Sequence, residues 1–382
     1  MSSTPYLTET HEQARNAARQ FADKVVAPYV EASESEEQLP LELFRKIGQA
    51  GYLGIRSPEQ YGGSGSDLLT ECLVIEQISR ACCGIASAMM PQLLVGSMIG
   101  RFGTEEQRQR HMPSIISGER ICSIAMSEPG AGSDVSAIAT AAIRRGDEFV
   151  INGTKTFITN GPDAGVVLLL AYTDRSAGNR GLSLFLVERG TPGFSVSRKL
   201  PKVGNRASQV CELIFQDCVV RRSALLGETE GGFRNLLGVV TMSRVVFAAR
   251  ALGVAQSALD AAMAYAGSRV AFGQQIGKFQ AIQFKLADMA TNLEAARLLT
   301  YQAAWTSDQG MPIVKHAAMA KLFASERAVE ITSEALQIHG GYGYIMETPV
   351  QRYWRDARLL TISEGTSEIQ RQTIAKQLEL GL

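Results

Sequence analysis

The side chain best placed for chemistry is Glu364, in the run Ser363-Glu364-Gly365-Thr366. The run reads as a loop that leads into a helix, and a carboxylate there can be aimed at a bound substrate as a general base. Acidic residues beside Ser, Gly and Thr at a helix start more often cap the helix or interact with its dipole. Taken locally, the run therefore favours a cap and leaves a catalytic base as the alternative.

Other catalytic signatures do not occur in the sequence. There is no phosphate-binding lysine loop of the Walker type and no G-x-S-x-G nucleophile elbow. The four histidines are scattered and form no metal-binding pair: His11, His111, His316 and His339. We therefore predict neither a hydrolase nor a metal site.

Composition and charge are those of an ordinary globular chain. Of the 382 residues 45% are hydrophobic and 20% charged, and Lys+Arg and Asp+Glu number 38 each. A balanced charge predicts neither a nucleic acid nor a membrane as a main partner, and neither an uninterrupted apolar run of about 20 residues nor a secretion signal is found. The cysteines show no C-x-x-C pairing, which predicts reduced, buried thiols and a cytoplasmic location. They are Cys72, Cys82, Cys83, Cys122, Cys211 and Cys218.

The elements that must position Glu364 follow from two changes of periodicity, which divide the chain into residues 1–118, 119–228 and 229–382. The first part has helical spacing, the second a period of two, and the third long Ala- and Leu-rich helical stretches. The expected fold is α+β, with an N-terminal helical domain, a middle antiparallel β-domain and a C-terminal four-helix bundle. Helices are expected over residues 9–30, 39–50, 241–267, 281–307, 314–338 and 367–380, with a loop over 57–66.

The middle part predicts short strands in a largely antiparallel or barrel-like sheet, because the turns between them leave no room for crossover helices. Asn152-Gly153 between two apolar runs predicts a two-residue hairpin turn. Further strands are expected over residues 166–172, 182–188, 193–197 and 211–215. This order disfavours a Rossmann enzyme, which alternates strand and helix from its start.

Four segments together closely resemble the acyl-CoA dehydrogenase family, in that family's order and over essentially the whole chain. They are Ala-Met-Ser-Glu-Pro-Gly-Ala-Gly-Ser-Asp-Val at 125–135, Phe-Ile-Thr-Asn-Gly at 157–161, Arg-Val-Ala-Phe-Gly at 269–273 running on to Gln280, and Gln-Ile-His-Gly-Gly-Tyr-Gly-Tyr at 337–344 continuing to Ser-Glu-Gly-Thr-Ser-Glu-Ile-Gln-Arg at 363–371.

The resemblance implies an FAD enzyme that removes hydrogens from the α and β carbons of an acyl-CoA thioester. Glu364 matches the family's catalytic base, and electrons would pass to an electron-transfer flavoprotein. A homotetramer, built as a dimer of dimers, is the implied assembly. Each flavin would then contact two subunits, since the segments around Arg269 and Gly340 are expected to reach the neighbour's cofactor.

The resemblance also assigns the cofactor and substrate residues. Short hydroxyl side chains beside an aromatic suit a flat cofactor with polar edges, and arginine suits its phosphates. The expected cofactor-binding residues are Ile124, Met126, Ser127, Ser133, Phe157, Ile158, Thr159, Arg269, Phe272, Gln280, Gln337, Gly340, Gly341, Thr366 and Glu368. The expected substrate-binding residues are Ser133, Arg244 and Gly365.

Three features of the sequence bear on the substrate and on the identity of the base. Ser363 stands where family members often carry Tyr, which leaves acyl length and branching open. Some members take their base from the position before the arginine, but here that position is Ser243, so Glu364 is unopposed. The pocket-forming segment 86–97 contains no arginine, which disfavours a dicarboxylic acyl group.

Alternatives remain at this stage. The substrate could be an acyl group on a carrier protein, because the phosphopantetheine arm is common to both carriers. An oxidase or a reductase would fit the same residues. A member that has lost catalysis and serves as a scaffold is disfavoured by the presence of Glu364 and by the neutral charge.

Overall fold

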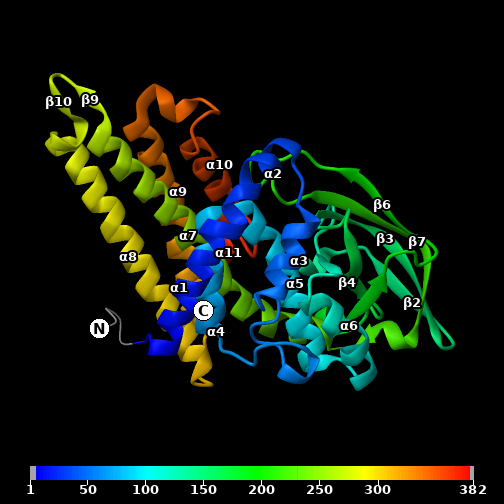
Figure 1. The fold of residues 1–382 in the computed structure, drawn as a ribbon. Coiled ribbons are helices and arrows are strands. Elements are labelled where there is room, and N and C mark those ends of the chain that lie inside the picture. The colour runs from blue at the N-terminus through cyan, green and yellow to red at the C-terminus, as the bar shows by residue number, and fades with distance from the viewer. Residues whose placement is uncertain (1–5, 230, 379–382) are drawn as a thin grey trace.

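The computed structural model describes residues 6–229 and 231–378. It has helices at the N-terminal end, a sheet in the middle and long helices at the C-terminal end, so the predicted fold class is confirmed (Figure 1). The last residues of the helix expected over 367–380 and the start of the N-terminal segment lie outside the described residues.

The N-terminal helices begin at the residues that cap them. Thr8 and Thr104 each form a capping box, and the Asp67 side chain accepts from the Thr70 backbone N–H at 2.8 Å. The single helix expected over 9–30 is interrupted by a π-helical turn, and a 3-10 turn with Pro28 follows, where proline cannot donate a backbone hydrogen bond. The helices are α1 (Glu9–Phe21), α2 (Val30–Glu36), α3 (Leu41–Gln49), α4 (Leu68–Ala81), α5 (Cys83–Phe102) and α6 (Glu105–Ile116).

The middle sheet has the strand order β6-β7-β3-β2-β4-β5-β8, with β1 added beside β4. Its pairs are antiparallel except that β1 and β2 each pair parallel with β4, so the sheet is largely antiparallel as predicted. The strands are β1 (Ile121–Ala125), β2 (Ala141–Arg145), β3 (Glu148–Thr159), β4 (Ala164–Tyr172), β5 (Leu182–Glu188), β6 (Phe194–Lys199), β7 (Val210–Arg221) and β8 (Leu225–Leu226).

The hairpin turn predicted at Asn152-Gly153 is wrong. Strand β3 runs through both residues and pairs antiparallel with β7. The turn lies instead between β2 and β3, where Gly146 has a φ of 62°. A Cβ at Gly153 would lie 2.3 Å from Oγ1 of Thr140. Glycine is therefore required here because two chain segments approach closely, and not because the chain turns.

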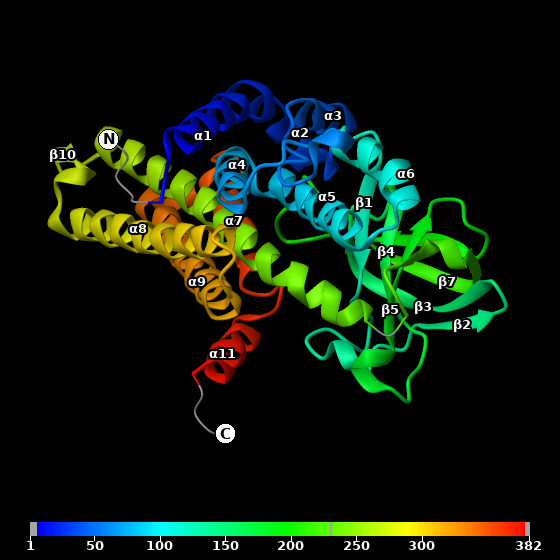
Figure 2. The ribbon, with the colours of Figure 1, turned by 90° about the horizontal axis from the view of Figure 1, so that it is seen from below.

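Three long helices dominate the C-terminal part, and α7 runs from the edge of the sheet to the far end of the molecule (Figure 2). There a small hairpin joins α7 to α8, and α9 packs against both helices. The elements are α7 (Gly232–Ser268), β9 (Val270–Ala271), β10 (Gln274–Gln275), α8 (Gln280–Asp308), α9 (Val314–His339), α10 (Val350–Leu360) and α11 (Ser367–Lys376).

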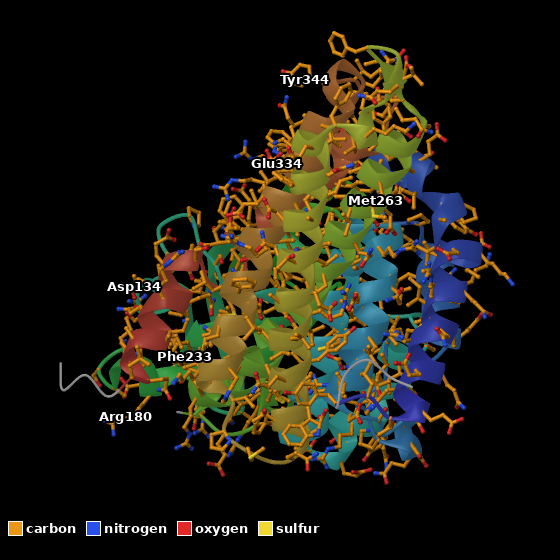
Figure 3. All side chains as sticks on the ribbon, turned by 90° about the vertical axis from the view of Figure 1, so that its left-hand side faces the viewer. Asp134, Arg180, Phe233, Met263, Glu334 and Tyr344 are labelled. Atoms are coloured by element: carbon orange, nitrogen blue, oxygen red, sulfur yellow. The ribbon has the colours of Figure 1, made fainter. Side chains whose placement is uncertain are left out.

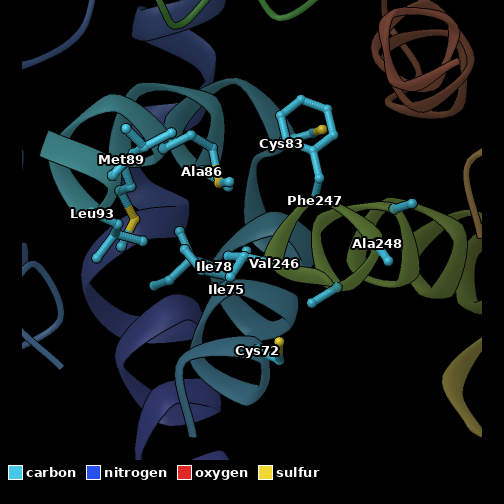
Figure 4. Close-up of a cluster of buried hydrophobic side chains, with 14 of the residues drawn as sticks. Cys72, Ile75, Ile78, Cys83, Ala86, Met89, Leu93, Val246, Phe247 and Ala248 are labelled. Atoms are coloured by element: carbon cyan, nitrogen blue, oxygen red, sulfur yellow. The ribbon is translucent and has the colours of Figure 1, made fainter. Parts of the chain in front are cut away.

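The core is continuous from the N-terminal helices into α7, as the buried side chains of α4, α5 and α7 in Figure 4 show. Helices α4 and α7 touch at Gly253, where a Cβ would lie 2.3 Å from the carbonyl oxygen of Glu76. Side-chain hydroxyls fix the same contact, because Ser79 Oγ donates to the Arg250 carbonyl at 2.6 Å and Ser257 Oγ to the Arg80 carbonyl at 2.5 Å. The two helices are thereby locked in register.

Helices α5 and α7 are also long and apolar enough to cross a membrane by length and composition alone. Most of each apolar window is buried inside the fold, as is usual for core helices. All six cysteines are buried, which confirms that part of the sequence prediction.

A buried ion pair between α4 and α8 supplies a stability test. Glu76 accepts from Arg297 at 3.1 Å and from the Tyr301 hydroxyl at 2.7 Å, and its side chain is almost fully buried. Replacing Glu76 by Gln removes the buried partner of Arg297 and leaves only the half-exposed Glu294 beside it, so the free energy of unfolding in urea should fall by about 3 kcal/mol. Glu294, half exposed and paired with the same arginine, is the matched control. Glu294→Gln should cost less than about 1 kcal/mol, and equal losses would contradict the assignment.

Candidate active site

Glu364 lies in the loop that joins α10 to α11, with a left-handed backbone at φ 57°. The cap of α11 is Thr366, whose side chain accepts from the Ile369 backbone N–H at 3.3 Å. The alternative role of Glu364 as the helix cap is therefore taken by another residue. Its Oε1 atom is buried and has no hydrogen-bond partner among the described residues, so the carboxylate is available for another purpose.

Positive side chains from two long helices surround this carboxylate. Burial raises the pKa of Glu364, while the Ser243 hydroxyl and the charges of Arg244, Lys321 and Arg250 act in the opposite direction. The Lys321 ammonium is fully buried and donates to the Gly365 carbonyl at 2.7 Å, which ties α9 to the loop. Burial lowers the pKa of Lys321 to about 8, although the nearby Glu364 opposes that shift.

The left-handed backbone region also marks other predicted site residues. Outside glycine, the described residues with a left-handed backbone are Glu37, Phe157, Asn160, Asn205, Asp217, Phe272 and Glu364. Asn and Asp tolerate this region, and Glu37 lies at the C-cap of α2. The remaining three are Phe157, Phe272 and Glu364, each of which the resemblance assigns to the site. For such side chains the conformation costs roughly 1–2 kcal/mol, and strain of this kind concentrates at functional sites.

Phe157 lies where the pairing of β3 with β7 shifts register, between Lys155 and Ile158. The bulge turns its ring out of the sheet, so that the side chain is 71% exposed. Ile158 next to it is buried in the sheet core, so only its backbone could meet a ligand. Thr159 is half-buried, and its carbonyl accepts from Ser123 Oγ at 2.8 Å.

The segment that follows β1 is fixed to β3 by a buried ion pair. Lys155 Nζ donates to Glu128 at 2.8 Å and to the Met126 carbonyl at 3.0 Å, and the Thr156 N–H donates to the Ser127 carbonyl at 2.9 Å. Burial lowers the pKa of Lys155 to about 8, against the opposing effect of Glu128. These bonds hold Met126 and Ser127, both half-buried, close to the base of the Phe157 bulge.

A second group of predicted residues lines a hollow of about 390 Å³ at the far end of α7 and α9. Arg269, Gly340 and Gly341 lie on it, and the Tyr265 and His339 rings stack at its wall with centroids 4.4 Å apart. A Cβ on either glycine would meet nothing within 4 Å, so the backbone there is open to a ligand. An exposed arginine beside open backbone suits a phosphate-bearing cofactor.

The predicted residues thus form separate groups within one chain. The hairpin that bears Phe272, whose ring is 95% exposed, lies at the opposite end of the molecule from the sheet that bears Phe157 (Figures 1 and 2). Gln337 and Gln280 are exposed near the hairpin, Ser133 is exposed in the loop after β1, and Glu368 is exposed in the first turn of α11. One small ligand cannot touch both ends of a single chain.

Sequence reasoning assigned Arg244 to substrate binding, and the structure shows its charge acting on Glu364, but Lys321 and Arg250, whose charges do the same, were missed. Both lie in Ala-rich helical stretches, where a charged side chain is normally predicted to be exposed to solvent. The available signal was that no charged residue stands three or four positions from either of them, which is typical of a buried charge.

Comparison with known proteins gives matches over the whole described fold. Sequence models of the N-terminal, middle and C-terminal domains of acyl-CoA dehydrogenase match residues 8–119, 123–218 and 230–379. The short-chain specific acyl-CoA dehydrogenase of Bos taurus mitochondria is 45% identical over 374 residues, which cover 97% of this chain and 90% of that protein.

Two solved structures share the fold closely. Butyryl-CoA dehydrogenase from Megasphaera elsdenii has a TM-score of 0.95 at 38% identity, covering 99% of this chain and 100% of that one. A chain from the structure described as the electron transferring flavoprotein of Acidaminococcus fermentans has a TM-score of 0.96 at 41% identity, with 100% of both chains covered.

The exposed ring of Phe157 allows cofactor binding to be separated from folding. Phe157→Ala removes almost no buried contact, so the free energy of unfolding of the cofactor-free protein should stay within about 0.5 kcal/mol. If the ring stacks on FAD, the dissociation constant for FAD should rise about three- to tenfold. Flavin fluorescence titration measures this dissociation constant.

Phe149→Ala, which empties a buried position in the same strand, is the contrasting variant and should lower the free energy of unfolding by about 3 kcal/mol or more. Unchanged FAD affinity in Phe157→Ala would remove this residue from the site.

Proposed function

The chain belongs to the acyl-CoA dehydrogenase family, whose members are FAD enzymes, and on that premise we propose that Glu364 removes the α-proton of an acyl-CoA thioester. The observation that carries the proposal is the buried Oε1 atom of Glu364, which has no partner among the described residues and is held in a left-handed loop beside three cations. A structural carboxylate would be expected to satisfy such an atom with a hydrogen bond.

The reaction takes a proton from the α-carbon and a hydride from the β-carbon. The α-proton of a thioester is acidic because the resulting charge delocalises onto the carbonyl oxygen, and hydrogen-bond donors at that oxygen lower the barrier further. FAD, when bound, supplies the acceptor for the hydride. The backbone N–H of Glu364 has no hydrogen bond within the described structure, so it is free to donate to the carbonyl oxygen.

The charges around Glu364 suit a base of intermediate strength. Burial alone would favour the neutral acid, and a base held neutral cannot accept a proton. Lys321, Arg244 and Arg250 favour the carboxylate and so oppose the effect of burial. The pKa of Glu364 still lies above that of an exposed glutamate, which increases its affinity for the proton that it must take.

The partners of the reaction are part of the proposal. Electrons would leave through an electron-transfer flavoprotein, in keeping with the structural neighbour that comes from such a system. The protein would need at least a second copy to complete each cofactor site, because the two groups of cofactor residues lie at opposite ends of one chain, and a homotetramer is the assembly that the family resemblance implies. Exposed apolar side chains on the C-terminal helices support this, and Met263 and Tyr344 are visible among them in Figure 3.

The proton transfer is tested by Glu364→Gln, which keeps the volume and removes the base. FAD content should be unchanged, while the rate at which an acyl-CoA bleaches the flavin absorbance under anaerobic conditions should fall by about 10²–10⁴-fold. Glu330→Gln, an exposed carboxylate on α9, is the control and should leave that rate unchanged.

Near-normal bleaching in Glu364→Gln would show that another group is the base. If no acyl-CoA bleaches the flavin of the wild-type protein, thioesters of a carrier protein are the next substrates, and bleaching by these alone would replace acyl-CoA in the proposal.

The role of Lys321 is tested by the pH dependence of kcat/KM. Glu364 must be ionised to act, so activity should be lost as pH falls through its raised pKa, at a higher pH than for an exposed glutamate. Lys321→Met removes a charge that favours the carboxylate, so the midpoint of this acid limb should move to higher pH. Lys24→Met, on an exposed position of the N-terminal region, should leave it in place. A limb that does not move, or moves to lower pH, would contradict the coupling.

A further inference from the structure

Arg250 is a fully buried arginine on α7, and the charges of Glu364 and Asp356 act on it without forming an ion pair among the described residues. Its side chain is 1% exposed, it forms no ion pair within the described residues, and its Nε and Nη2 atoms have no hydrogen-bond partner. The guanidinium carbon lies over the Phe247 ring, 4.1 Å from the ring centroid. A guanidinium stays protonated at neutral pH even when burial lowers its pKa. Such a charge is costly to bury unless something binds to it.

Arg250 shares a helix face with the residue that meets Glu364. Ser243, Phe247 and Arg250 stand at positions i, i+4 and i+7 of α7, which form one stripe along a helix. Ser243 lies beside the Glu364 carboxylate. Seven residues of helix span about 10 Å, so Arg250 lies two turns further along the same stripe.

The opposite wall of this stripe belongs to α5. Figure 4 shows Phe247 next to Cys83, with Ala86 and Met89 following on the same helix. These α5 side chains are apolar and buried, so none of them can neutralise the guanidinium. The segment 86–97 likewise offers no charge.

Besides Glu364, the acid whose charge acts on Arg250 is Asp356, and this residue is already engaged. Asp356 on α10 accepts from the Asn205 backbone N–H at 2.5 Å, and burial together with Glu34 raises its pKa to about 7. It forms no ion pair with Arg250 within the described residues. The Nε and Nη2 atoms of Arg250 therefore have no acceptor among those residues.

We propose that Arg250 binds a carboxylate at the far end of the acyl chain, which makes the substrate a monothioester of a dicarboxylic acid. The inference rests on the proposed function, because it takes the thioester end to lie at Glu364. It departs from the sequence expectation, which looked for such an arginine only in the segment 86–97. Helix α7 supplies the charge from the other wall.

The chemistry of the guanidinium gives this site its selectivity. Two free N–H donors can take both oxygens of a carboxylate in a bidentate pair, the strongest arrangement for this pair of groups. A plain acyl chain ending in a methyl group would leave the donors unsatisfied and the charge buried. Sites built around a buried polar group reject the analogue that lacks the matching group far more strongly than apolar pockets reject an extra methylene.

The experiment compares acyl-CoAs of equal carbon number: glutaryl with pentanoyl, adipyl with hexanoyl, and suberyl with octanoyl. Anaerobic flavin bleaching and kcat/KM are measured for the wild type, Arg250→Gln and Arg250→Lys, with Arg19→Gln on the exposed face of α1 as the control. Binding without turnover is read by calorimetry on Glu364→Gln with the same pairs.

We expect the wild type to favour one dicarboxylic member over its partner by at least about tenfold, in kcat/KM and in affinity. Arg250→Gln should lose about 30-fold or more with that substrate, and clearly less with the plain acyl-CoA, for which only the effect of the Arg250 charge on the pKa of Glu364 is lost. Arg250→Lys should keep part of the preference, because it retains the charge but not the bidentate pair. Arg19→Gln should behave as the wild type.

A wild-type protein bleached equally or better by the plain acyl-CoAs would overturn the assignment of Arg250 and leave the proposed function intact. Equal losses with both members of a pair in Arg250→Gln would do the same, since they would make the arginine a structural residue. Bleaching by no thioester at all would remove the proposed function and this inference with it. The wild-type comparison decides the matter even if the Arg250 variants fail to fold.

Discussion

The contact of α4 with α7 at Gly253 is the constraint on which the rest of the structure depends. No side chain fits between these helices there, because a Cβ would overlap the carbonyl of Glu76. Hydroxyls of Ser79 and Ser257 fix the register on either side of the contact. Since α7 runs on from this point to the sheet in one direction and to the hairpin in the other, the contact sets the orientation of the face that carries Ser243 and Arg250. The site is therefore aligned by packing in the middle of a helix that also supplies its side chains.

The protein also contains three positions where the local structure is unfavourable. Left-handed backbone at Phe157 and Glu364, and unpaired charge at Arg250, are each destabilising when taken alone. They persist because the surroundings are rigid. At Phe157 strand β3 is paired with β7 on both sides of the bulge, and at Glu364 the Lys321 ammonium binds the Gly365 carbonyl. At Arg250 the α4–α7 contact holds the helix in place. Most of the remaining core is ordinary apolar packing, and its contribution to the free energy of unfolding offsets the cost of these three positions.

Much of the fold could be predicted from periodicity, because long amphipathic helices and alternating strands leave a clear pattern. The hairpin at Asn152-Gly153 could not, since the same dipeptide serves a turn in one context and a close approach to Thr140 in another. The prediction of one continuous α-helix over 9–30 was also wrong, because the chain forms a 3-10 turn around Pro28. Of the candidate site, Glu364 was accessible through its sequence context. For Lys321 and Arg250 the local pattern could indicate only that the charge is buried, because what the charge meets depends on which helices pack together, and that information is not local to either residue.

The burial of all six cysteines has a chemical consequence. Burial raises the pKa of every one of these thiols, to about 11 for Cys83 and Cys218 and about 12 for Cys82 and Cys211, so the reactive thiolate is scarce in the folded protein. Alkylating reagents and mild oxidants then reach a sulfur only after the surrounding helices or sheet open. The cysteines are distributed over α4, α5 and the sheet, so the order in which they are labelled would give a map of which part of the chain opens first.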